Sequence, residues 1–234
     1  MTKPVLRLFL PLVLPSLLSG LARADEPAPA PDHSGLYLGH SWVANVRKLA
    51  IFGKLHARSD TWVLARFTQR GGKLEVEQQP CDLAIKPVGG VRVGLLPGVV
   101  PRLPPAHFDL ETGPQGLVAA PWRTGWDVED LDTDGEPGVT FRVQAVLCGG
   151  DLDVSSETHS AARAAWEGAD LVGELDVDVA QRILAASGGC LKLAARDSLE
   201  HMEGRFRYTP APAGTTCASA ARRGWPQASE IPRP

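Results

Sequence analysis

The chain has 234 residues, with 24 lysines and arginines against 27 aspartates and glutamates, so its formal net charge at pH 7 is −3. This length suits one substantial domain, and the acidic balance gives no electrostatic reason to bind nucleic acid. The 24 glycines and 20 prolines interrupt the chain so often that few stretches could hold three helical turns, which excludes a mainly helical fold.

The first residues have the three parts of a secretory signal peptide. Lys3 and Arg7 precede an apolar stretch, 8–18, and small residues follow as far as Ala24. The apolar stretch is about half the length needed to span a bilayer. We therefore expect residues 1–24 to be cleaved, leaving an extracytoplasmic protein, periplasmic or secreted, with no transmembrane anchor in the mature chain.

The composition then divides the mature chain into three parts. Residues 25–34 form a proline-alanine spacer that we expect to be flexible. A β domain follows over residues 35–217. Residues 218–234 are small, polar and proline-bearing, which predicts a loose C-terminal tail.

Alternation of apolar and polar residues indicates strands throughout the domain. Thr61–Gln69 and Lys73–Gln79 alternate on either side of Gly71-Gly72, which predicts a β-hairpin with a glycine turn. The same period marks further strands in residues 81–85, 91–95, 139–147 and 171–179.

Three other segments do not show a clear strand pattern. Alanines favour helix in Ser160–Glu167 and Val179–Ala186, although nothing around them requires it. Leu96–Pro105 contains four prolines and cannot be a central strand, so it should cross an end of a barrel or cover an open edge. The predicted fold class is all-β: a single antiparallel barrel or sandwich with few short helices.

Four cysteines remain after the signal peptide is removed: Cys81, Cys148, Cys190 and Cys217. In an oxidising compartment they most simply form two disulfides. Of the three pairings we favour Cys81 with Cys148 and Cys190 with Cys217, because each joins the ends of segments that look like neighbouring strands. A zinc site is the competing use, but no C-x-x-C pair is present.

An acidic segment between two predicted strands resembles a calcium loop. Asp130, Asp132 and Asp134, followed by Gly135, match positions 1, 3, 5 and 6 of the EF-hand pattern, and Glu136 would offer its backbone carbonyl at position 7. Without a cation, carboxylates a few ångströms apart repel one another by roughly 1 to 4 kcal/mol per pair. We therefore expect a structural calcium ion; the alternative is an exposed, metal-free acidic turn.

The loop departs from a normal EF-hand at position 12, where Phe141 replaces the bidentate glutamate. Any closing carboxylate must come from elsewhere, and Asp127, Glu129 and Asp176 are the candidates. The sequence does not choose among them.

A search for catalytic patterns finds none. No two of the six histidines have the spacing of a zinc pair, and neither a G-x-S-x-G nucleophile elbow nor a phosphate-binding glycine loop is present. The acids of Asp170–Asp178 alternate with apolar residues and are expected to form a solvated strand face, with paired catalytic carboxylates as the alternative. The chain is therefore not expected to be an enzyme.

The acidic loop ends in residues 137–140, Pro-Gly-Val-Thr, and is followed by the segment 181–187 and the closing Cys217. This half of the chain resembles predicted exported bacterial proteins of unknown function whose loop reads D-x-D-G-D-G-x-P-G-x-T. Thr133 stands at a glycine position of that pattern, and Glu136 stands at the x before the proline, where those proteins have lysine. The resemblance implies no activity.

Gly39 and Trp42 near the first strand, with Arg205 or Arg207 near the last, are similar to the signature of lipocalin-type ligand carriers. That resemblance implies a barrel with an apolar ligand cavity. The aromatic residues that could line such a cavity are Trp42, Trp62, Phe141, Phe206 and Tyr208.

Two functional hypotheses follow. The first is a non-catalytic exported β domain, stabilised by calcium and disulfides, that acts by surface interaction with an unknown protein or envelope component in the envelope or outside the cell. The second is a lipocalin-like carrier of a small apolar ligand or lipid. A closed barrel with a hollow apolar interior of several hundred cubic ångströms would favour the carrier, and a filled interior would favour the first hypothesis, which is the one we adopt from the sequence.

Overall fold

The computed structural model describes residues 31–49, 53–114, 116–146 and 148–229, so the signal peptide expected in residues 1–24 lies outside the described residues. Within them, no helix has both the length and the apolar character needed to cross a bilayer. The elements are β1 (Gly35–Leu49), β2 (Gly53–Arg70), β3 (Lys73–Ile85), β4 (Arg92–Leu95), the 3-10 turn η1 (Val100–Arg102), β5 (Ala106–Gly113), β6 (Gly116–Trp126), β7 (Val139–Gln144), β8 (Gly150–Glu167), β9 (Asp170–Ala186), α1 (Gly189–Ala194), β10 (Ser198–Ala211) and α2 (Cys217–Arg223).

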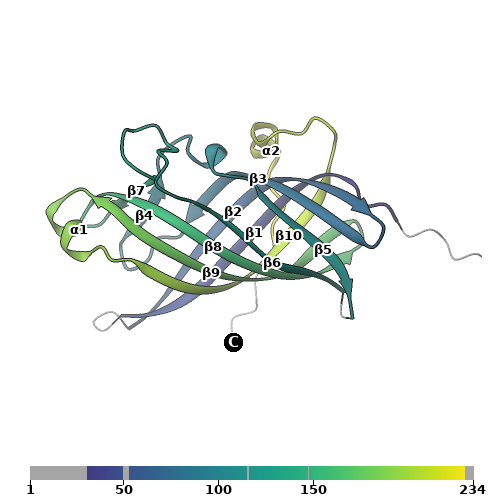
Figure 1. The fold of residues 1–234 in the computed structure, drawn as a ribbon, viewed down its shortest axis with the longest axis horizontal. Coiled ribbons are helices and arrows are strands. Elements are labelled where there is room, and N and C mark those ends of the chain that lie inside the picture. Colours follow the sequence, from purple (N-terminus) through teal and green to yellow (C-terminus); the bar gives the residue numbers. More distant parts are fainter. Residues whose placement is uncertain (1–30, 50–52, 115, 147, 230–234) are drawn as a thin grey trace, which may run out of the picture. The chain divides into compact units, whose positions relative to one another are not determined.

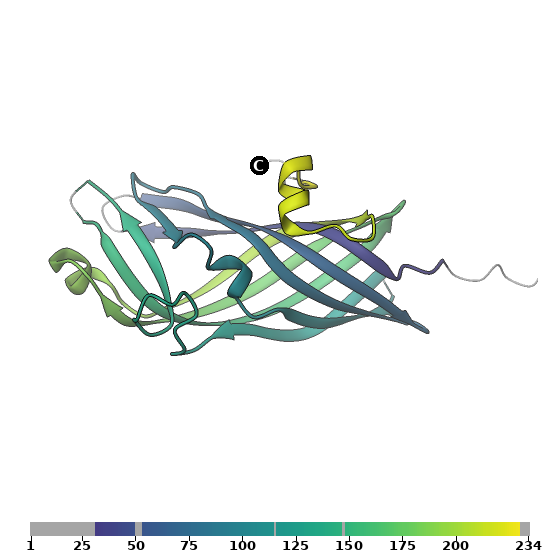
Figure 2. The same ribbon diagram turned by 90° about the horizontal axis from the view of Figure 1, so that it is seen from above.

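The strands form one antiparallel sheet in the order β4-β7-β8-β6-β5-β3-β2-β1-β10-β9. A further ladder joins β8 to β9, so eight of the strands form a ring (Figures 1 and 2). The long β8 pairs with β6 over residues 156–164 and with β7 over residues 150–154. Beyond β7 the sheet ends at β4, and no ladder joins β4 to β3 in the described residues. The all-β class is confirmed. The ring is complete where β6 pairs with β8, but at the other end the wall is split between β3 and β4 in the described residues, so the barrel is not closed over its whole length.

The predicted hairpin is present, and its alternation separates the inside of the barrel from the outside. β2 and β3 pair from Arg70 and Lys73 outward, across the turn at Gly71-Gly72. Val63, Ala65 and Phe67 of β2 are buried in the main core. The residues between them point to the opposite, outer face because successive side chains of a strand alternate.

The two alanine-rich segments are strands, so their helix propensity was misleading. Residues 160–167 and 179–186 belong to β8 and β9, which pair along almost their whole length. Ala162 and Ala164 are buried in the same cluster as Phe67. Their small side chains leave room for aromatic rings inside the barrel, and pairing on both edges of β8 overrides a weak local preference.

The proline-rich segment Leu96–Pro105 covers the open edge, as expected. It contains η1, and the carbonyls of Pro101 and Leu103 accept hydrogen bonds from the Gln79 side chain of β3 (3.2 and 3.0 Å). Val99 and Leu103 are buried in a second core cluster at the split, together with residues of β7 and β8. The segment therefore fills the gap that no backbone ladder closes.

All four cysteines form disulfides, but the expected pairing is wrong. Cys81 is bonded to Cys217, and Cys148 to Cys190. The first bond attaches β3 to the start of α2, and the second joins the loop before β8 to α1, which follows β9. β8 and β9 are neighbours in the ring, so the Cys148–Cys190 bond joins segments that are adjacent in the sheet. The Cys81–Cys217 bond instead depends on the docking of α2 on β3.

The segment after β10 is docked on the barrel and does not form the loose tail expected. Thr216 and Ser219 make a capping box at the start of α2, and α2 lies outside the barrel against the wall that contains β1, β2 and β3 (Figure 2). Ala228 is 5% exposed. At the other end, the described part of the spacer also makes contacts, since the His33 ring stacks on Trp166 at 3.6 Å.

Candidate functional site

The acidic loop connects β6 to β7 and is closed by backbone hydrogen bonds. The N–H of Leu131 donates to the carbonyl of Gly138 (3.2 Å), and the N–H of Gly138 donates to the carbonyl of Val128 (3.3 Å). Leu131 packs against the second core cluster at the split. The loop is thus anchored by its apolar residue, and its position is tied to the wall of the barrel.

Asp130 organises the turn. Its Oδ1 accepts hydrogen bonds from the N–H groups of Thr133 (2.6 Å) and Asp134 (3.3 Å), and its Oδ2 accepts one from Gly135 (3.0 Å). Thr133 has φ 61°, a left-handed conformation that is unfavourable for a β-branched residue. Its hydroxyl accepts a hydrogen bond from Arg102 of η1 (2.8 Å), so the crossover segment supports the turn from outside.

The three aspartates converge on one point. One oxygen from each of Asp130, Asp132 and Asp134 lies within 4.8 Å of the others. Calcium–oxygen distances of about 2.3–2.6 Å allow two ligands to be up to roughly 5.2 Å apart, so the three oxygens fit a single coordination shell. Oδ1 of Asp132 is buried and has no hydrogen-bond partner among the described residues. Buried carboxylate oxygens normally have a partner, and a cation would supply one.

A fourth carboxylate, that of Asp153, lies next to the loop. The Thr140 N–H donates to Asp132 Oδ2 (2.7 Å), and the Thr140 hydroxyl lies 2.8 Å from both Asp134 Oδ2 and Asp153 Oδ1. One hydroxyl has a single proton to donate, so it cannot satisfy both carboxylates at once. Asp153 is only 6% exposed, which makes its compensation by a nearby positive charge more important.

Asp153 was missed by the sequence, which suggested other closing carboxylates. Asp127 lies 3.9 Å from Arg182, and Asp176 belongs to a different cluster, on β9. Only the β7–β8 register, which pairs Thr140 with Asp153, brings this carboxylate to the loop. Glu136 is exposed and donates its N–H to Asp134 Oδ1 (3.0 Å).

The pKa values of neighbouring aspartates shift in opposite directions. Partial burial raises the pKa of Asp132, and the Asp134 and Asp130 carboxylates add to the rise. Burial acts the same way on Asp130, but the N–H groups of Gly135 and Thr133 outweigh it and lower the pKa of Asp130. The closely spaced acids are therefore not equivalent, and Asp130 is stabilised as a carboxylate relative to Asp132.

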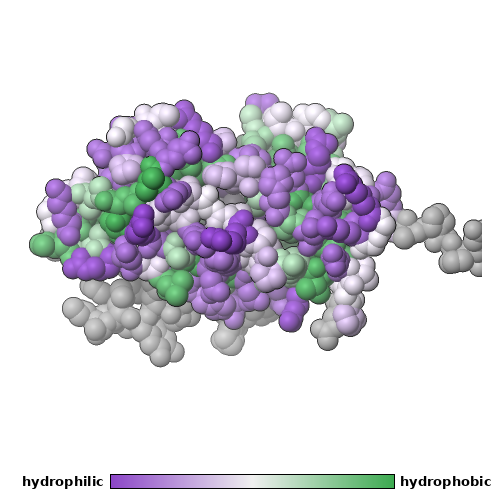
Figure 3. Space-filling view, viewed as in Figure 1, coloured by the Kyte–Doolittle hydropathy of each residue, from purple (hydrophilic) through white to green (hydrophobic). Residues whose placement is uncertain are grey.

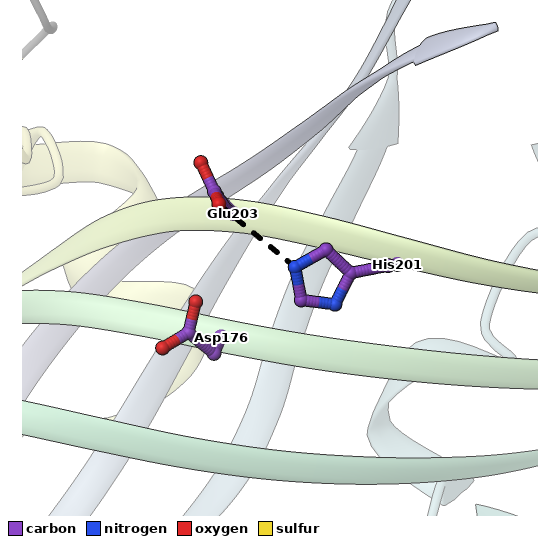
Figure 4. Close-up of side chains that lie close together, drawn as sticks. All are labelled: Asp176, His201 and Glu203. Carbon is purple, nitrogen blue, oxygen red and sulfur yellow. Dashed lines mark ion pairs between the residues drawn. The ribbon is translucent and has the colours of Figure 1, made fainter.

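A second group of potential metal ligands lies on the outer face of β9 and β10 (Figure 4). His201 and Glu203 come from β10 and Asp176 from the adjacent β9, and the Asp178 carboxylate accepts a hydrogen bond from His201 Nδ1 at 2.9 Å. The hydrogen bond with Asp178 raises the pKa of His201, and Asp176 and Glu203 contribute. All these side chains are exposed to water, so this group has the features of the solvated strand face expected from the sequence.

The interior of the barrel is filled at one end and hollow at the other. The main core cluster fills the end at which β5 turns into β6. Toward the end that carries α1, a cavity of about 400 Å³ remains. Its lining is mainly apolar and includes Ile85, Val93, Phe141, Val143, Leu152 and Ile183, with Gln181 and Glu200 among the polar residues. The Asn45 amide donates to the Glu200 carboxylate at 2.7 Å.

A larger hollow of about 730 Å³ lies at the wall formed by β6, β8 and β9. It is more open to solvent, and charged side chains such as Arg123, Glu157 and Arg182 border it. It suits an apolar ligand less well than the interior cavity does. An apolar group placed there would remove water from the polar side chains at the border, and this desolvation costs free energy.

Of the five aromatic residues expected to line a cavity, Phe141 lines the interior cavity. Phe206 and Tyr208 belong to the filled main core. Trp42 and Trp62 lie on the outer face, because they alternate with the inward residues of β1 and β2. The indole N–H of Trp42 donates to the Ser229 carbonyl (3.2 Å), so this ring holds the C-terminal segment instead.

A buried pair of polar residues lies beneath that segment. His40 Nδ1 accepts a hydrogen bond from the Ala228 N–H (2.9 Å), so Nε2 carries the proton and donates to Asp60 (3.1 Å). Burial lowers the pKa of His40. Burial opposes ionisation of Asp60, but hydrogen bonds from Arg58 and His40 outweigh it and lower the pKa of Asp60. Both imidazole nitrogens are engaged, so the pair has the form of a structural clamp.

No family model, curated protein or solved structure matches this chain.

Proposed function

We propose that the protein is an exported β domain that binds a small apolar ligand, such as a lipid chain, in the interior cavity at the α1 end. The cavity carries this proposal. Protein interiors are normally packed to a high density, and the other half of this barrel is. A hollow of about 400 Å³ with mainly apolar walls falls within the usual size of ligand sites, roughly 300–1,000 Å³.

The disulfides support the compartment that this function needs. Two bridges and no free cysteine among the described residues are typical of an extracytoplasmic protein. The Cys148–Cys190 bond also restrains two loops at the hollow end, where a cavity weakens the packing. Periplasmic and secreted locations are both compatible with the proposal.

Binding of N-phenyl-1-naphthylamine, a neutral apolar dye whose fluorescence rises in apolar surroundings, tests this function. We expect saturable binding to the wild-type protein and at least tenfold weaker binding to Val143→Phe, which narrows the cavity. Val118→Phe, on the outer face of β6, is the matched control and should bind as the wild type does. If all three proteins bind the dye equally, or if the wild type does not bind it, the ligand-binding function is refuted and surface interaction alone is left.

We further propose that the acidic loop binds a structural calcium ion through Asp130, Asp132 and Asp134, with the backbone carbonyl of Glu136 and the Asp153 carboxylate as additional candidate ligands. The unpartnered Oδ1 of Asp132 and the spacing of the three oxygens support it. The loop is anchored in the second core cluster through Leu131, and that cluster shares Phe141 with the cavity lining. An ion at this position would therefore stabilise one wall of the cavity.

Thermal unfolding with calcium and with a chelator tests the site. An ion present at about 100 times its dissociation constant stabilises the folded state by about 2.7 kcal/mol, which we expect as a clear rise in the melting temperature. Asp132→Asn should remove most of this rise. Asp176→Asn, in the exposed cluster of Figure 4, should leave it intact. A melting curve that calcium does not move would refute the site.

A further inference from the structure

The hollow end of the barrel is surrounded by three loop segments. They are the 86–91 loop between β3 and β4, the described part of the loop between β7 and β8, and the segment 187–197 that contains α1, each taken with the strand residues next to it, Arg92 of β4 and Leu199 of β10 among them. The register places all of them at one end, because β4 begins beside the end of β7 and β10 begins beside the end of β9. We call this set the cavity rim.

Large apolar side chains are exposed at the cavity rim. Of the six that are exposed among the described residues, four lie here: Val91, Val146, Leu193 and Leu199. Val146 is 95% exposed, and Leu193 and Leu199 are each 78% exposed. Figure 3 shows apolar surface over α1 and the neighbouring β4 and β7, among polar residues. Val91 both lines the cavity and reaches solvent, so the apolar interior is continuous with the rim.

The rim also carries positive charge, although the chain as a whole is acidic. Arg92, Lys192 and Arg196 are exposed and form no ion pair with a carboxylate in the part of the chain that the structure describes. The nearby acids are already engaged. Asp151 pairs with Arg142 (2.9 Å), and Asp197 accepts a hydrogen bond from the Ile183 N–H (2.9 Å).

We infer that the cavity rim docks on the surface of a lipid bilayer that contains anionic phospholipids. Exposed apolar side chains interspersed with unpaired bases are what an interfacial membrane contact requires: the apolar groups enter the headgroup boundary and the bases meet lipid phosphates. The unpaired bases complement an anionic membrane in charge. This inference deepens the proposed function, because a cavity that opens at the membrane contact can take up or release an apolar ligand without exposing it to water.

Sedimentation with vesicles tests the inference. The full mature protein should bind vesicles of phosphatidylcholine with phosphatidylglycerol and bind pure phosphatidylcholine at least tenfold more weakly. Each rim base replaced by glutamine should weaken binding about fivefold, so Arg92→Gln/Lys192→Gln/Arg196→Gln should lose roughly a hundredfold. Leu193→Glu/Leu199→Glu should abolish binding. Val118→Glu, which removes an exposed apolar residue near the opposite end of the barrel, should bind as the wild type does.

Two further measurements separate this inference from its alternatives. Leu193→Glu/Leu199→Glu should lose vesicle binding but keep dye binding and an unchanged melting temperature. This result would support a rim that acts in docking alone. Vesicle binding that Val143→Phe leaves unchanged while it weakens dye binding would show that the two sites are separable. If the wild-type protein binds neither vesicle type, the inference is overturned. If the protein is a dimer in solution and Leu193→Glu/Leu199→Glu dissociates it, the rim is an interface with a second copy of the chain.

Discussion

The disulfide pairing gives the sharpest prediction, because alternative pairings leave different thiols free. Replacing Cys81 and Cys217 together by serine removes one complete bridge and should leave no free thiol. Replacing Cys81 and Cys148 removes one half of each bridge and should leave two. A colorimetric thiol count in denaturant, made without reductant on folded protein, reads the result directly.

The structure also sets the magnitude of the loss in stability. The bridges close loops of 136 and 42 residues. The loop-entropy relation then gives about 5 kcal/mol for Cys81–Cys217 and about 4 kcal/mol for Cys148–Cys190 as upper figures. Urea unfolding of Cys81→Ser/Cys217→Ser and of Cys148→Ser/Cys190→Ser should show a loss of stability in each variant, with the larger loss in the first. Two free thiols in the Cys81→Ser/Cys217→Ser variant would refute the pairing and the docking of α2 on β3 that depends on it.

Two further predictions concern β1, at His40 and at Gly39. Burial lowers the pKa of His40, so the folded state binds fewer protons than the unfolded state between that lowered value and the ordinary pKa of about 6.5. The contribution of His40 to stability is complete above pH 6.5 and is lost as the pH falls. His40→Gln should therefore show a smaller drop in unfolding free energy between pH 7.5 and pH 5 than the wild type. An equal drop would contradict the clamp, in which His40 also faces the charged groups Asp60, Arg58 and Lys86. A Cβ added at Gly39 would lie 2.5 Å from the Tyr208 ring, so Gly39→Ala should cost about 1–3 kcal/mol in chemical denaturation, whereas Gly94→Ala, with open space around it, should cost little.

The local features of this protein were readable from the sequence. Alternation from residues 61 to 79 predicted the β2–β3 hairpin, because side chains of a strand alternate whatever the strand pairs with. The spacing of Asp130, Asp132 and Asp134 predicted their convergence, since a tight turn brings alternate residues together without help from the rest of the chain. The prolines of Leu96–Pro105 excluded a central strand for the same local reason.

Local propensity failed where distant contacts compete with it. Residues 160–167 contain several alanines, yet they form a strand because β6 and β9 pair with both edges of β8. The loose tail was wrongly expected because small polar residues need a partner surface to become ordered, and the sequence did not show that His40 and Trp42 point outward to provide it.

By itself, then, the sequence determined an all-β domain with its principal turns, the use of every cysteine in a bridge, and an acidic loop with converging carboxylates. The turns and the loop depend on residues close together in the chain, and the use of the cysteines on their even number and the expected compartment. Only the tertiary structure decided the ring and its split, which cysteine meets which, the arrival of Asp153 at the loop and the hollow beside α1. Each of these depends on the register between strands far apart in sequence, and a shift of one residue in register would move every such side chain to the other face of the sheet.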